Sequence, residues 1–70
     1  MDYSKLIKFI REKLFLSQTD LANLLDVSFS SISRWEAGTF EPTIKAKKKI
    51  SELCKKENIN LEGFYDNEKK

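Results

Sequence analysis

The sequence predicts an all-α fold, and three observations support this class. Apolar side chains recur every three or four residues over most of the 70 residues, which is the period of an amphipathic helix. Polar residues that cap helices precede these apolar segments, and an aspartate or a glycine follows them. No segment alternates apolar and polar side chains as a half-buried strand does. We therefore expect helices and no strands.

The first helix is expected at about 3–14, where apolar residues lie four apart and charged residues fill the gaps. Ser17 is a good N-cap for a second helix at about 18–25, and the charge of Asp20 suits its positive end. Asp26 is expected to end this helix, because aspartate tolerates a left-handed backbone. The expected buried residues are Leu6, Ile7, Ile10 and Leu14 in the first helix, and Leu21, Ala22, Leu24 and Leu25 in the second.

A third helix is expected at about 29–37, with Ser28 as its N-cap and with Ile32 and Trp35 facing inward. Gly38 is expected to end it in the left-handed conformation. Trp35 is interpreted as a core residue, because an aromatic side chain on an inward face is far more often core than contact.

A fourth helix is expected at about 43–57, because Pro42 stands at its start, where the missing N–H costs nothing. Lys47, Lys48 and Lys49 point in different directions on such a helix, so a solvated face is the favoured interpretation of this run. A short fifth helix or a packed turn is expected at about 60–65. Their expected apolar residues are Ala46, Ile50, Leu53 and Cys54 in the fourth helix, and Leu61, Phe64 and Tyr65 in the fifth element.

The length and composition predict one domain, residues 1–70, and exclude several classes of protein. No apolar run reaches the eighteen or so residues of a membrane span, and the first residues lack the layout of a signal peptide, so a cytoplasmic protein is expected. Cys54 is the single cysteine and there is no histidine, so we expect no disulfide, no zinc site, no cofactor and no enzyme.

The net charge of +2 is small for a nucleic-acid-binding protein, and it is unevenly distributed. Residues 17–42 hold one cation, Arg34, against four carboxylates, whereas the segments on either side are basic. Most of the attraction to phosphate would therefore come from the flanking helices.

Two short helices joined by a tight turn, with small polar side chains at the start of the second, are typical of proteins that insert a helix into the major groove of DNA. The chain resembles the Cro and repressor family of bacterial and phage regulators, the XRE-type helix-turn-helix proteins, over residues 3 to about 57. The matching positions are Leu16, Ser17, Gln18, Leu21, Ala22, Val27, Ser28, Ile32, Ser33, Trp35, Glu36, Gly38 and Pro42. The resemblance implies a five-helix, lambda-repressor-like DNA-binding domain that is associated with the nucleoid when bound.

By this resemblance, the residues that read bases are expected in the first turn of the third helix and one turn further along. Arg34 suits guanine O6 and N7, because its planar fork matches two acceptors, and a phenylalanine can press against a thymine methyl group. Alternatives remain open for both residues: a phosphate contact or a solvated surface charge for Arg34, and a side chain that folds back over the helix start for Phe29. The expected base-reading residues are Phe29, Ser30, Ser31 and Arg34.

Phosphate contacts are expected where the second and fourth helices begin, because free N–H groups at a helix start attract anions. Helix capping alone is the alternative role for the hydroxyl side chains. The expected phosphate-contacting residues are Ser17, Gln18, Thr39, Thr43 and Lys45.

The resemblance also implies a partly buried ion pair between Arg11 and Glu36, which ties the first helix to the end of the third. Three residues depart from the family pattern. Phe15 and Asp26 stand where the family often has glycine, so the junction at Phe15 is expected to be strained or differently shaped. Asp26 and Glu41 each place a negative charge near the expected DNA-binding side.

The favoured function is sequence-specific binding of double-stranded DNA in transcription regulation. Two copies on a near-palindromic site are expected, because one helix reads only about four to six base pairs. The alternative is a protein-interaction or targeting module, such as an antitoxin or the N-terminal domain of a larger DNA-modifying protein. Ile59, Leu61, Phe64 and Tyr65 are candidates for a homodimer surface, and closure of the chain's own core is the other interpretation of these residues.

Overall fold

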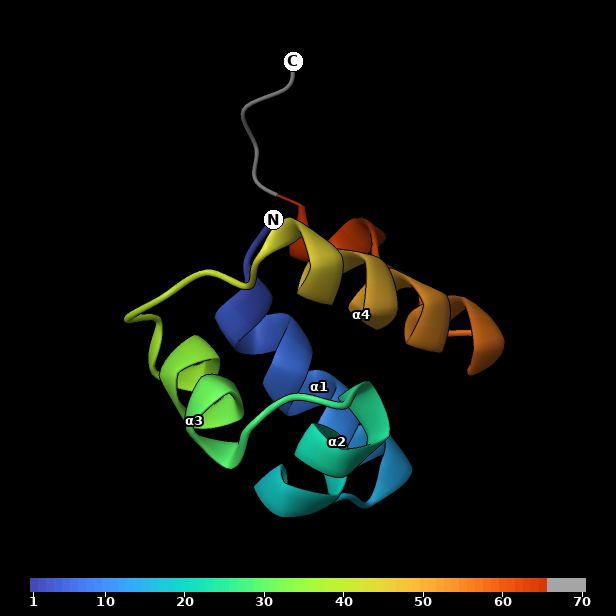
Figure 1. Cartoon of the computed structure of the whole chain (residues 1–70). Coiled ribbons are helices and arrows are strands. Elements are labelled where there is room, and N and C mark those ends of the chain that lie inside the picture. Colours follow the sequence, from blue (N-terminus) through green and yellow to red (C-terminus); the bar gives the residue numbers. More distant parts are fainter. Residues whose placement is uncertain (66–70) are drawn as a thin grey trace.

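Four α-helices and one short 3₁₀ turn make up residues 1–65, the part of the chain that the computed structural model describes (Figure 1). No strand occurs within this part of the chain, so the all-α prediction is confirmed. The elements are α1 (Tyr3–Leu14), α2 (Gln18–Leu25), α3 (Phe29–Ala37), α4 (Ile44–Lys56) and the 3₁₀ turn η1 (Glu62–Phe64).

The helices begin and end close to the predicted residues because local capping signals determine both ends. At each start, an N-cap side chain accepts a hydrogen bond from the backbone N–H three residues further on. Ser17 and Asp20 form a full capping box, with distances of 3.0 and 3.1 Å. The four N-cap residues are Asp2, Ser17, Ser28 and Thr43.

A residue with a positive φ angle directly follows α1, α2 and α3, and one comes a position later after α4, beyond Glu57; in each case the next N–H bonds back to a carbonyl in the last turn. Gly38 (φ 77°) ends α3, and three non-glycine residues do the same elsewhere, namely Phe15, Asp26 and Asn58. Phe15 adopts the left-handed conformation that glycine favours, which is strained for a bulky side chain, as one of the two expectations for this junction stated. Its side chain is 93% exposed and fills no space in the core.

The core lies where α1 passes between α4 on one side and α2 with α3 on the other (Figure 1). Leu6, Ile7, Ile10, Leu21 and Ile32 are completely buried there. The prediction that Leu24 is buried is wrong, since this side chain is 53% exposed. Its side chain lines a hollow between α2 and α4, together with Leu25 and Leu53.

The last element is the 3₁₀ turn η1, packed against the core, which agrees with the packed-turn alternative expected at about 60–65; the five-helix count is not confirmed among the described residues. Asn60 accepts a hydrogen bond from the N–H of Glu62 (2.9 Å), a turn that competes with helix formation, and the segment is too short to sustain an α-helix. The N–H of Asp2 donates to the carbonyl of Phe64 (2.7 Å), and the rings of Phe9 and Phe64 lie 5.3 Å apart. These contacts join η1 to the N-cap and to the middle of α1.

Three of the four candidates for a dimer surface lie against the chain's own core. Ile59 is buried, and Leu61 and Phe64 are half-buried against the same cluster. Tyr65 is 60% exposed. Closure of the core therefore accounts for the apolar character of this segment up to Phe64.

None of the helices within residues 1–65 combines the length and the apolar character that crossing a membrane requires.

Candidate nucleic-acid interface

The turn between α2 and α3 is set by Asp26, whose φ of 58° makes it the left-handed residue that ends α2. The next N–H, of Val27, donates to the carbonyl of Ala22 (2.9 Å), and Ser28 then caps α3. The side chain of Val27 is half-buried against the core and fixes the turn from inside. Three consecutive residues therefore determine how α3 leaves α2.

The two faces of α3 differ sharply in burial. Ile32 and Trp35 are buried (0% and 6% exposed) and hold the helix from behind. On the other face, Phe29 is 53% exposed, and Ser30 and Arg34, which lie one helical turn apart, are exposed as well. The first turn of α3 is therefore open to a partner.

The serines at the start of α3 are more constrained than the sequence indicates. The Oγ of Ser28 accepts the backbone N–H of Ser31 (3.1 Å), and the two hydroxyl groups lie 3.0 Å apart. Ser31 is only half-exposed. Among the four expected base-reading residues, Ser31 is therefore less accessible than Phe29, Ser30 and Arg34.

The expected phosphate-contacting residues fall into two groups. Ser17, Thr39, Thr43 and Lys45 are exposed, and the hydroxyl groups of Ser17 and Thr43 serve as N-caps. Thr43 and Lys45 line a shallow hollow of about 160 Å³ together with Val27 and Lys49. The start of α4 therefore lies beside the turn between α2 and α3.

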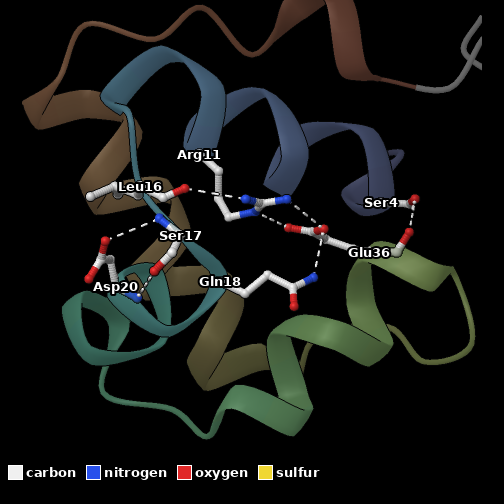
Figure 2. A network of polar contacts seen from close by, with 7 residues as sticks. All are labelled: Ser4, Arg11, Leu16, Ser17, Gln18, Asp20 and Glu36. Carbon is white, nitrogen blue, oxygen red and sulfur yellow. Dashed lines mark hydrogen bonds and ion pairs between the residues drawn. The ribbon is translucent and has the colours of Figure 1, made fainter.

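Gln18 differs from the others, because its side chain points into the protein. Its Nε2 donates to a carboxylate oxygen of Glu36 at 3.0 Å, and the residue is half-buried (Figure 2). Sequence reasoning missed this role. No local pattern indicates it, because Gln18 and Glu36 lie 18 residues apart in the sequence.

Glu36 is the centre of a polar network that joins α1, α2 and α3 (Figure 2). Arg11 donates through Nε at 2.5 Å and through Nη2 at 3.1 Å, so the guanidinium binds both carboxylate oxygens. Its Nη1 donates to the carbonyl of Leu16 at 3.3 Å, and the hydroxyl of Ser4 donates to the carbonyl of Glu36 at 2.7 Å. The network fixes the C-terminal half of α3 relative to the first two helices.

Burial and hydrogen bonding act in opposite directions on the pKa of the Glu36 carboxyl. Glu36 is 7% exposed. Burial raises its pKa, but the hydrogen bonds from Arg11 and Gln18 and the positive charges of Arg11 and Lys8 together lower it by more, so the pKa lies below the usual 4.5. Glu36 is therefore ionised at neutral pH, and the pKa of the Arg11 guanidinium is raised in turn, first of all by its hydrogen bond to Glu36.

Lysines of α4 offset both negative charges that depart from the family pattern. The Nζ of Lys49 lies 3.8 Å from a carboxylate oxygen of Asp26, and the Nζ of Lys47 lies 2.6 Å from one of Glu41. The Nζ of Lys47 also lies 5.3 Å from the ring centre of Tyr3. The three lysines of the run therefore differ in their surroundings. Lys47 and Lys49 lie near carboxylates, and Lys48 is exposed.

The match of a family model accords with this geometry. The model, described as helix-turn-helix, matches residues 7–57, which is most of the chain. The protein belongs to this family, the helix-turn-helix domains of XRE and Cro/C1 type. No curated protein and no solved structure matches the chain. The family is one of DNA-binding domains and is typically non-enzymatic.

Proposed function

We propose that this protein regulates transcription by binding double-stranded DNA sequence-specifically, with α3 inserted in the major groove. The observation that supports this function best is the contrast between the two faces of α3. Ile32 and Trp35 anchor the helix from behind, while its first turn and Arg34 are exposed. A helix presented in this way can bring three or four side chains to base edges.

In this proposal Arg34 reads a guanine, because its in-plane N–H groups match O6 and N7. Phe29 contacts a thymine methyl group, and Ser30 and Ser31 contribute hydrogen bonds at the start of the helix. Ser17, Thr39, Thr43 and Lys45 bind phosphates on either side of the groove, where the first N–H groups of α2 and α4 face the same anions. Gln18 then acts on DNA through the position of α3, because its amide donates to Glu36.

The proposed binding is symmetric, with two copies of the chain on half-sites about one helical turn apart. Ile59, Leu61 and Phe64 are packed against the core, so Tyr65 is the residue of the predicted dimer surface that remains exposed. Selection of bound duplexes from a random pool tests both points. A palindromic consensus supports a pair of copies, and a single short consensus contradicts the pair while leaving DNA recognition intact.

Two substitutions separate base reading from phosphate binding on the selected duplex. Arg34→Ala is expected to cost roughly 1 to 3 kcal/mol and to relax the preference at one base position, whereas Lys45→Ala should weaken binding to every sequence alike. Lys55→Ala is the matched control, because Lys55 is an exposed lysine at the other end of α4. An equal loss on all sequences for Arg34→Ala would make Arg34 a phosphate ligand.

A second function, as a protein-interaction module, is favoured by a specific feature of the charge distribution. Residues 17–42, which include α2 and α3, carry Arg34 against four carboxylates, and this acidic balance disfavours attraction of the segment to phosphate. A salt titration with duplex DNA distinguishes the two functions, since binding to phosphate weakens steeply as salt rises. Failure to retain any duplex at low salt would exclude DNA binding and favour the second function.

A further inference from the structure

The guanidinium of Arg34 lies over the ring of Phe40, with its central carbon 5.4 Å from the ring centre. This distance is within the range of about 6 Å for a cation–π contact. Phe40 is 57% exposed, so the ring fills no space in the core that would explain its position. Arg34 is also the only lysine or arginine between residues 17 and 42. An exposed aromatic ring therefore contacts the single basic side chain of residues 17–42.

The backbone brings the two residues together. Gly38 has a φ of 77° and reverses the chain at the end of α3. The N–H of Gly38 donates to the carbonyl of Trp35, and the N–H of Thr39 donates to that of Arg34 itself, both at 3.1 Å. Buried Pro42 restricts the other end of the segment. Phe40 is therefore placed beside the last turn of α3 by hydrogen bonds that do not involve its ring.

We propose that Phe40 is a positioning residue that holds the guanidinium of Arg34 ready to read a base. The inference rests on the DNA-binding function proposed above. A phenyl ring has no hydrogen-bond acceptor that would occupy the N–H donors of the guanidinium, and these donors are the groups that recognise guanine. A long side chain that is restrained before binding also loses less rotamer freedom when it binds. Phe40 thereby increases selectivity without touching DNA.

The expected effect is small and measurable. A cation–π contact at an exposed site corresponds to a change of about 2- to 5-fold in an equilibrium constant. This change should appear in the selectivity ratio. We define this ratio as the dissociation constant for a duplex altered at the base pair that Arg34 reads, divided by the dissociation constant for the best selected duplex.

The experiment compares three variants with the wild-type protein. Phe40→Leu keeps an apolar side chain and removes the ring, and Phe40→Trp keeps a ring. Phe15→Leu is the matched control, because it removes an exposed ring from another part of the molecule. We expect Phe40→Leu to lower the selectivity ratio about 2- to 5-fold, and the other two variants to retain it. In an Arg34→Ala background, Phe40→Leu should cause no further loss of selectivity.

A second measurement needs no DNA. The ring should shift the NMR signals of the Arg34 side-chain protons upfield in the free wild-type protein, and Phe40→Leu should abolish the shift. An unchanged selectivity ratio in Phe40→Leu, alongside a loss of selectivity in Arg34→Ala, overturns the role of Phe40 and leaves DNA reading intact. Tighter binding of Phe40→Leu to every duplex also overturns it, because the ring would then hold Arg34 away from DNA. If Arg34→Ala keeps the wild-type base preference, base reading by Arg34 is wrong, and the role of Phe40 is wrong with it.

Discussion

Replacing Arg11 by methionine tests the network around Glu36. The change removes the hydrogen bonds at 2.5 and 3.1 Å and leaves the buried carboxylate with the amide of Gln18 at 3.0 Å. Breaking one side of a buried ion pair costs about 3 to 5 kcal/mol. Arg11 is 26% exposed, so water can reach the carboxylate in the variant, and we expect the cost to be about 2 to 3 kcal/mol.

A loss of this size is large for so small a protein. Natural domains hold roughly 0.05 to 0.15 kcal/mol per residue, which gives about 4 to 10 kcal/mol for this chain. Each kcal/mol shifts the melting temperature of a domain of this size by about 4 to 8 °C, so Arg11→Met should lower Tm by roughly 10 to 20 °C. Circular dichroism and the fluorescence of buried Trp35 follow the transition at pH 7.

The double variant Arg11→Met with Glu36→Leu provides the control. A buried ion pair replaced by apolar side chains of similar size often costs little, so the double variant should regain most of the lost stability. A Tm for Arg11→Met within about 3 °C of the wild-type value would refute the reasoning, because this corresponds to less than 1 kcal/mol. A double variant that is no more stable than the single variant would also refute it.

Acidification gives an independent check on the same carboxylate. Because the folded state lowers the pKa of Glu36 below 4.5, the group binds fewer protons when folded, and its contribution to stability is complete above that pH. The contribution should disappear as the pH falls through the lowered pKa. The difference in Tm between the wild-type protein and Arg11→Met should therefore shrink over the same interval, and a constant difference would contradict this assignment.

Three further predictions follow from single residues. Gly38→Ala should reduce the free energy of unfolding by about 1 kcal/mol. The new Cβ meets no other atom, but a φ of 77° is unfavourable for alanine. An unchanged midpoint of urea denaturation would contradict this. The Cys54 thiol, whose pKa burial raises, should react with a thiol reagent only as fast as the protein unfolds, and immediate labelling of the folded protein would be the opposite result. Asp26→Asn keeps a residue that tolerates the left-handed conformation and removes a 96% exposed charge; it should tighten binding to all duplexes, most clearly at low salt in a fluorescence anisotropy titration.

The candidate site was only partly predictable from the sequence. The exposed first turn of α3 and the inward position of Trp35 follow from helical periodicity, and the structure places both accordingly. The contact of Phe40 with Arg34 was not predictable, because it depends on how the chain turns after Gly38. The burial of Leu24 was predicted wrongly, since an apolar stripe does not indicate how far the neighbouring helix covers it.

The sequence by itself determined where the helices begin and end. N-cap side chains such as Ser17 and left-handed residues such as Asp26 interact within a few residues along the chain, so their effect can be read locally. Only the tertiary structure decided that Gln18 and Ser4, which lie 18 and 32 residues away from Glu36, join the ion pair with Arg11 that the resemblance implied. It also decided that the last element is a 3₁₀ turn joined to the start of α1. These outcomes depend on which surfaces meet when the helices pack, and no local pattern specifies that.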